Sequence, residues 1–185
     1  MSQLTKNQRV TGLSTGCPVD RISLAESGFT LIELMITVSI MAILLAIAVP
    51  SFQNVALSSK LTSLSNNFVA SAQLARSEAI KRNTEVTLCA SSDGTTCAGA
   101  WKDGWVVLAG GAVIYRQDIL PNGFLLVDAG GLTSLDFQPS GVGATAADLT
   151  LCRSTPEVGS LQRIIHVSAT GRPGVEKVPG ATSCP

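Results

Sequence analysis

The chain has 185 residues, of which 45% are hydrophobic and 14% are charged. This composition excludes an intrinsically disordered chain and a highly charged coiled coil, and it fits one globular domain with a further segment. Lysine and arginine together number 13, as do aspartate and glutamate. The chain as a whole therefore has no excess of basic residues that would bind nucleic acid and no excess of acidic residues that would bind cations. The single histidine, His166, excludes histidine-rich metal sites.

An apolar run of 21 residues, FTLIELMITVSIMAILLAIAV, occupies positions 29–49 and contains one ionisable side chain, Glu33. At about 1.5 Å per residue, a helix of this length crosses the hydrocarbon core of a bilayer. The 28 residues before it carry a small basic excess, which favours a cytoplasmic N-terminus and places the remainder on the other side. Because an acid is costly in lipid unless it finds a partner, Glu33 is a functional candidate.

A cleavable secretory signal is the alternative for this run, since Ala46-Ile47-Ala48 has the small residues of a cleavage site. We prefer the membrane helix for two reasons. A secretory signal ending there would exceed the usual length of roughly 15 to 30 residues, and its apolar core would contain an acid.

An amphipathic helix is predicted for residues 51–83, because apolar residues recur there at intervals of three and four. Lys81, Arg82 and Asn83 predict its end, and Pro50 should kink the helix where a backbone hydrogen bond is lost. The stripe should pack on a sheet; the alternative, a coiled coil with a partner, is disfavoured because the heptad pattern lapses after Phe68. Its members are Leu57, Leu61, Leu64, Phe68, Ala72, Ala75 and Ala79.

The remaining residues, 84–185, predict short strands. Residues 29–93 contain no glycine and one proline, whereas residues 94–185 contain 14 glycines and six prolines. Gly110-Gly111 predicts a two-residue hairpin, and the short connections leave no room for helical crossovers. We therefore expect an α+β fold in which a long N-terminal helix packs on an antiparallel β-sheet, with Trp101, Trp105 and Phe137 as core anchors. The period-two segments are 84–90, 104–109, 112–116, 123–129, 134–138, 148–153, 162–169 and 175–178.

The residues around the start of the apolar run resemble the signal of type IV pilins and of the pseudopilins of type II secretion. Ser27-Gly28 is followed by Phe29-Thr30-Leu31-Ile32-Glu33-Leu34. The resemblance implies that a prepilin peptidase cuts between Gly28 and Phe29 and that Phe29 is N-methylated. It also gives Glu33 and Pro50 roles in subunit assembly, with Glu33 neutralising the N-terminal amine of a neighbouring subunit. The 28-residue leader is longer than many in the family, and Glu26 lies close to the cut.

The second half is similar to one branch of that family, the minor pseudopilin H of type II secretion and the minor pilin T of type IV pili. The matching elements are Phe137-Gln138-Pro139-Ser140-Gly141 and the stretch from Arg163 to Gly171-Arg172. The resemblance implies the type IV pilin fold with four parts. These are a leader (1–28), a transmembrane and polymerisation helix (29–50), an amphipathic helix (51–83) and a β-rich globular domain (84–185).

The same resemblance implies where the chain acts and with what. It predicts a single-pass protein of the cell inner membrane whose globular domain lies in the periplasm. Its partners would be the prepilin peptidase, the membrane and other pilin or pseudopilin subunits. The chain would be a minor subunit of a pilus or a secretion pseudopilus, with a role in priming or capping. Both machines use the same signal and the same fold, so both alternatives stay open.

Four cysteines remain once Cys17 is removed with the leader, and an even number outside the cytoplasm predicts two disulfides. Three pairings are conceivable. We prefer Cys89 with Cys97, which closes a turn-rich loop, and Cys152 with Cys184, which ties down the C-terminus. A zinc site is the alternative, and the lack of a C-x2-C pair among these cysteines argues against it.

The sequence contains no recognisable set of catalytic residues. The sequence has no nucleophile motif with a base, no phosphate-binding loop and no dinucleotide fingerprint, so we predict no enzyme activity, no cofactor and no metal. His166 lies in an alternating strand, and we interpret it as a solvated or hydrogen-bonded strand residue.

DNA binding for uptake is the alternative function, as the resemblance to minor pilin T implies through a C-terminal Gly-Arg-x-Arg loop. Here that loop reads Gly171-Arg172-Pro173-Gly174 and lacks the second arginine. Arg163, Arg172 and Lys177 remain as candidate phosphate contacts. The mature chain would carry ten basic and eleven acidic residues, which argues against strong binding.

Overall fold

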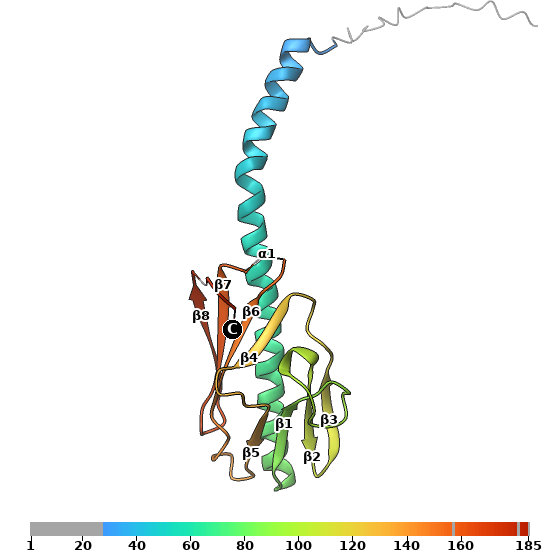
Figure 1. Ribbon diagram of the computed structural model, residues 1–185, viewed down its shortest axis with the longest axis vertical. Helices are drawn as coiled ribbons and strands as arrows, with labels where there is room; N and C mark the ends of the chain where they lie inside the picture. Colours follow the sequence, from blue (N-terminus) through green and yellow to red (C-terminus); the bar gives the residue numbers. More distant parts are fainter. Residues whose placement is uncertain (1–27, 157, 181, 185) are drawn as a thin grey trace, which may run out of the picture. The chain divides into compact units, whose positions relative to one another are not determined.

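The computed structural model describes residues 28–156, 158–180 and 182–184. One long helix, α1 (Leu31–Arg82), precedes the strands (Figure 1). The chain divides into two compact units between Ala42 and Ile43. The strands are β1 (Val86–Ala90), β2 (Trp105–Ala109), β3 (Ala112–Gln117), β4 (Phe124–Asp128), β5 (Ser134–Phe137), β6 (Ala147–Arg153), β7 (Leu161–Val167) and β8 (Pro173–Pro179), with a short 3-10 helix, η1 (Trp101–Asp103), before β2.

Both ends of α1 have the caps that their residues favour. At the start, the Thr30 hydroxyl accepts a hydrogen bond from the Glu33 N–H at 3.2 Å. At the end, Asn83 adopts a left-handed conformation with φ of 51°. The Asn83 N–H donates to the Ile80 carbonyl and the Thr84 N–H to the Ala79 carbonyl, which is the Schellman pattern. The helix runs through Pro50 without interruption.

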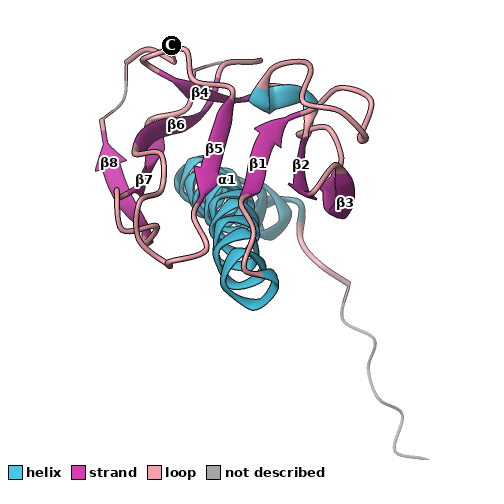
Figure 2. Cartoon of the chain, turned by 90° about the horizontal axis from the view of Figure 1, so that it is seen from below, coloured by secondary structure: helices cyan, strands magenta, loops and turns pink. Residues whose placement is uncertain are grey.

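Two antiparallel sheets of four strands follow, in the orders β3-β2-β1-β5 and β4-β6-β7-β8. The sequence predicts one sheet, so the α+β architecture is confirmed while the number of sheets differs. The chain leaves the first sheet after β3, returns to it for β5 and leaves again, so β4 and β5 are edge strands of different sheets. Figure 2 shows both sheets curving around α1. Period two identifies strands, but it does not specify which edges pair.

The turn between β2 and β3 follows the predicted hairpin. Ala109 lies opposite Ala112, so Gly110 and Gly111 form the two-residue loop. Their φ angles are 58° and 82°. Positive φ at both positions is the type I′ geometry, whose twist matches that of paired strands and which glycine adopts without strain.

The core of the second unit lies between α1 and the two sheets. The seven stripe residues from Leu57 to Ala79 are all buried, and they belong to one cluster with residues of β1, β2, β5, β6 and β7. Phe68 packs edge-on against Trp101 and Trp105, with ring centroids 5.4 and 5.3 Å away. The buried indole N–H of Trp105 donates to the Ser71 hydroxyl at 2.9 Å. This bond satisfies a polar group that would otherwise destabilise the core.

Strand β8 forms the far edge of the second sheet and pairs with β7 alone. Its first and last residues are Pro173 and Pro179, which lie opposite Val167 and Leu161. Proline has no N–H to donate, so it is tolerated at such an edge. Beyond β8, the disulfide between Cys152 and Cys184 ties the C-terminal residues to β6.

Phe68 should be a main stabilising contact of the globular part. In a soluble fragment that starts at Ser51, we expect Phe68→Ala to lower the free energy of unfolding by about 3–5 kcal/mol, because it leaves a cavity between two tryptophans. Urea denaturation measures the loss. The matched control is Val55→Ala, since Val55 lies on the same helix but is 63% exposed; it should stay within about 0.5 kcal/mol of wild type. Equal losses in the two variants would contradict the packing described here.

Candidate functional site

The N-terminal part of α1 is an apolar surface that the chain itself does not cover. All residues from 28 to 56 are exposed, and Phe29 is 81% exposed. By length and composition this helix could cross a membrane. A continuous apolar surface of this size is not stable in water, so it requires lipid or other protein around it.

Glu33 is the one acid in this surface. Its backbone N–H is capped by Thr30, but its carboxylate forms no ion pair within the described parts of the chain. The next charged residue along the helix is Lys60. A carboxylate in apolar surroundings is stable only when a cation or hydrogen-bond donor reaches it. Any cation that pairs with Glu33 would therefore have to come from outside the described residues.

Gly28, the residue before the predicted cut, has no packing reason to be glycine. A Cβ atom built on Gly28 would contact nothing within 4 Å. Packing within the described residues would therefore accept a side chain at this position. The rest of the predicted leader, residues 1–27, lies outside the described residues, as does Cys17.

The three cations predicted to contact DNA do not form one surface. Arg172 and Lys177 are exposed, whereas Arg163 is only 2% exposed. The Arg163 guanidinium donates to the hydroxyls of Ser58 and Thr62 on α1 at 3.1 and 3.2 Å. This finding corrects the predicted role of Arg163 as a phosphate contact, because its side chain is buried and hydrogen-bonded to α1.

A cation that the sequence did not single out lies near Arg172 instead. Arg76 and Arg172 line one hollow together with Gln73, Ser77, Ile80, Gly171 and Pro173. Arg76 is fixed there, since its Nε and Nη2 atoms both donate to the Gly141 carbonyl at 3.1 and 2.9 Å. Among the residues that the structure describes, no carboxylate lines this hollow. Arg76 and Arg172 lie 96 positions apart in the sequence, so no local pattern could have paired them.

His166 lies between two carboxylates on the outer face of the second sheet. Its Nδ1 atom is 2.6 Å from Asp148 and its Nε2 atom is 3.3 Å from Glu176. The hydrogen bond to Asp148, followed by that to Glu176, raises the pKa of His166 above its ordinary value of 6.5. The pairing of Asp148 with His166 follows from strand register, which the sequence alone does not give. The arrangement contains no nucleophile, and it agrees with the interpretation of His166 as a hydrogen-bonded strand residue.

All four cysteines after the leader form disulfides, in the preferred pairing of Cys89 with Cys97 and Cys152 with Cys184. The zinc alternative needs free thiolates, which these bonds remove. In the loop closed by the first disulfide, the carboxylate of Asp93 accepts bonds from the Thr96 hydroxyl and from the Thr95 and Thr96 N–H groups. These bonds hold the pKa of Asp93 well below its usual range.

Comparison with known proteins agrees with this geometry. Residues 64–171 match the family described as Type II transport protein GspH, and residues 24–49 match the prokaryotic N-terminal methylation motif. Prepilin peptidase-dependent protein D of Escherichia coli (strain K12) is 40% identical over 76 residues, which is 40% of this chain. The match spans 44% of that protein, less than half its length.

Two crystal structures of the type IV minor pilin FimU of Pseudomonas aeruginosa (strain PAO1) share this fold. They are 22% identical to this chain, cover 63% and 64% of it and 92% and 90% of FimU, and have TM-scores of 0.50 and 0.52. At this identity the likeness establishes the fold alone, which is the type IV pilin fold predicted from the sequence.

The environment of His166 predicts a specific titration. We expect Asp148→Asn to lower the pKa of His166 toward 6.5, and Glu176→Gln to lower it less, because the Asp148 bond is the shorter. Since folding raises this pKa, the protonated ring stabilises the fold below about pH 6.5, and that contribution is lost as pH rises through the folded value. Proton NMR of the imidazole measures the pKa. Asp118→Asn, which alters a carboxylate paired with Arg116, is the control and should leave it unchanged.

Proposed function

The chain belongs to the Type II transport protein GspH family, and from this we propose that it is a minor subunit of a type IV pilus or of a type II secretion pseudopilus, acting in the initiation or at the tip of assembly. The observation that carries the proposal is the exposed apolar helix with its single acid, Glu33. The matched methylation motif, residues 24–49, includes the start of this helix and Glu33.

Processing is the first step of the proposed pathway. A prepilin peptidase would cut between Gly28 and Phe29 on the cytoplasmic side and methylate the new terminal amine of Phe29. Cleavage removes the polar leader, which otherwise anchors the chain by its charges. The new amine is a cation at the start of an apolar helix. It is the kind of partner that a buried carboxylate requires.

Assembly then transfers the helix from lipid to a bundle of similar helices. The apolar side chains gain little from this step, because lipid tails are as apolar as the helices. Packing and polar pairs must therefore favour the assembled state. We propose that Glu33 pairs with the Phe29 amine of a neighbouring subunit, and that Pro50 shapes the helix for this packing.

The globular part supports a location outside the cytoplasm. Both disulfides join cysteines of the region after α1, and such bonds persist in oxidising compartments such as the periplasm. We propose that the apolar helix lies in the inner membrane before assembly and that residues 84–185 lie in the periplasm.

Processing and assembly should be separable by mutation. In the native bacterium, Gly28→Leu should leave the leader attached, because it alters the residue directly before the proposed cut and adds a bulky side chain there. Glu33→Val should still be cut and methylated, but it should be absent from sheared filaments because the amine of the neighbour loses its partner. Intact mass spectrometry reads the first result and immunoblotting of filament fractions the second.

The control for Glu33 is Glu85→Gln, which removes an exposed carboxylate after the helix and should assemble normally. A wild-type chain that begins at Met1, or one cut near Val49, would contradict the proposed processing. Normal incorporation of Glu33→Val would contradict the proposed charge pair.

DNA binding is a second candidate, favoured by the hollow that Arg76 and Arg172 share. One arginine is fixed to the Gly141 carbonyl, the other is exposed, and no acid lines the hollow. Phosphate groups are the anions that such an arrangement could bind. With few cations, we expect the binding to be weak and sensitive to salt.

A gel shift with the soluble fragment from Ser51 tests this candidate. At low salt we expect a shift that Arg172→Ala weakens, because one phosphate contact is lost, and that disappears near physiological salt. Lys102→Ala removes a charge of the same sign that pairs with Asp103 elsewhere, so it should not change the shift. The absence of any shift for the wild-type fragment at low salt would end the DNA hypothesis.

A further inference from the structure

The guanidinium of Arg163 on β7 is a buried charge that has no acidic partner among the described residues. Its Nη2 atom donates to Ser58 Oγ and Thr62 Oγ1, and its Nη1 atom donates to the Gln162 carbonyl at 3.2 Å. No carboxylate in the described ranges 28–156, 158–180 and 182–184 forms an ion pair with it. Burial lowers the pKa of Arg163, but an arginine in a protein stays protonated, so the charge persists.

Stability alone does not explain this residue. Hydroxyl oxygens accept hydrogen bonds from a guanidinium without neutralising it, and removing a charge from water is costly unless an opposite charge compensates. An apolar side chain of similar volume commonly stabilises a core as well as or better than a buried ion. The positive charge of Arg163 beside α1 is thus best explained if a negative charge of another molecule can approach it.

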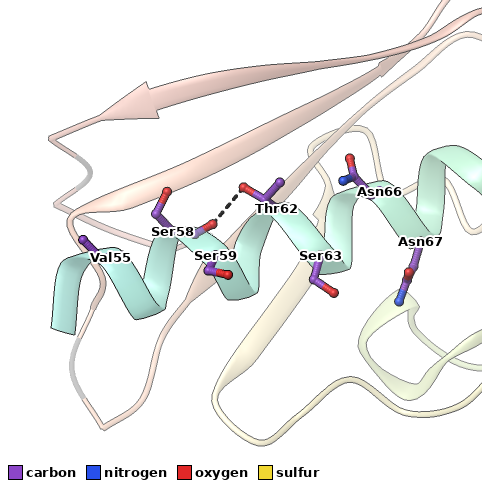
Figure 3. A pocket seen from close by; sticks show the side chains of 7 residues that line it. All are labelled: Val55, Ser58, Ser59, Thr62, Ser63, Asn66 and Asn67. Atoms are coloured by element: carbon purple, nitrogen blue, oxygen red, sulfur yellow. Dashed lines mark hydrogen bonds between the residues drawn. The ribbon is translucent and has the colours of Figure 1, made fainter. Parts of the chain in front are cut away.

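The two hydroxyls that contact Arg163 connect it to the surface. Ser58 and Thr62 line an open hollow of about 710 Å³ on α1 (Figure 3). The Thr62 hydroxyl donates its own proton to the Ser58 carbonyl at 2.8 Å. The Ser58 hydroxyl accepts from Arg163 and makes no other recorded bond in the described chain, so its proton is available to an external acceptor.

The hollow is lined by one face of α1 alone, and the composition of that face is suited to docking another helix. Its lining follows the helical spacing of three and four over about three turns, on the side of α1 away from the buried stripe. Every lining side chain is small or an amide, apart from one valine, so another helix can approach closely. The lining residues are Val55, Ser58, Ser59, Thr62, Ser63, Asn66 and Asn67.

The charge around this face is positive. Between Ile43 and Ala75 the helix carries one charged side chain, Lys60, and Arg163 lies behind it. No acid belongs to this stretch of helix. Complementarity therefore favours a partner that carries carboxylates and disfavours a basic one.

We propose that this face of α1, residues 55–67 backed by Arg163, docks a helix of another pilin-like subunit through an acidic side chain. The carboxylate would accept the free proton of the Ser58 hydroxyl and compensate the Arg163 guanidinium behind it. The inference rests on the proposed function, and it adds the surface used and the chemistry of the partner.

Photo-crosslinking in the native bacterium tests the docking face in the full-length chain. A photoreactive amino acid at Ser63, which lines the hollow without contacting Arg163, should crosslink to a helix of another subunit. Mass spectrometry should map the link to a segment with Asp or Glu within one helical turn. Arg163→Met should reduce the crosslink by about tenfold, because the acid of the partner loses its counter-charge. Lys102→Met removes an exposed cation outside the hollow and should leave the yield unchanged.

A second variant keeps the test decisive if Arg163→Met does not fold. Ser58→Glu places a carboxylate beside Arg163 within the same chain, so the domain should stay folded while the acid of the partner is repelled. We expect a loss of about tenfold here as well. Asn122→Asp adds the same charge at an exposed position outside the hollow and is the control. Resistance to protease and both disulfides verify folding.

The outcomes separate this inference from the proposed function. An unchanged crosslink in folded Ser58→Glu, or a mapped segment without an acid, overturns the docking proposal even when the wild-type chain is found in filaments. If the wild-type chain is absent from every assembled fraction, the proposed function fails and the docking proposal fails with it.

Discussion

An apolar helical surface that its own chain leaves uncovered is the constraint on which the rest of the structure depends. Residues 28–56 are exposed throughout, whereas the same helix from Leu57 to Ala79 contributes a buried stripe to the core. One continuous helix therefore meets two environments. Its first part requires lipid or neighbouring helices, and its second part provides the centre around which both sheets pack.

The side chains of the buried stripe become smaller along the helix. The buried stripe begins with leucine and phenylalanine and continues with Ala72, Ala75 and Ala79. Small residues allow strands to approach the helix closely, and the bulk needed to fill the space comes from Trp101 and Trp105 on the other side of Phe68. The indole bond to Ser71 then fixes how the first sheet meets the helix.

Local features of this fold could be predicted from the sequence because their causes are local. The hairpin at Gly110-Gly111 and the helix end at Asn83 depend on backbone conformations that only a few residues favour. The strands predicted from period two agree with the observed ones to within about two residues. The partition into two sheets depends on which edges meet across long stretches of chain, and no local pattern specifies it.

The position of Arg163 shows where reasoning from residue type misleads. Its charge suggested a surface contact, but in β7 it shares the buried face with Ile165 and Val167, while Ile164 and His166 lie on the other face. Strict alternation would have predicted that face. What the sequence could not supply is the reason the position is tolerated, because Ser58 and Thr62 reach it from a helix more than 100 residues earlier.

The prolines at both ends of β8 have a consequence for how subunits associate. An outer strand with free N–H groups at its ends can recruit a strand from another molecule and extend into an open-ended sheet. Pro173 and Pro179 interrupt that ladder at the last exposed strand of the second sheet. Strand pairing between two molecules is therefore disfavoured at both ends of this border, so that any association there has to use side chains instead of the backbone.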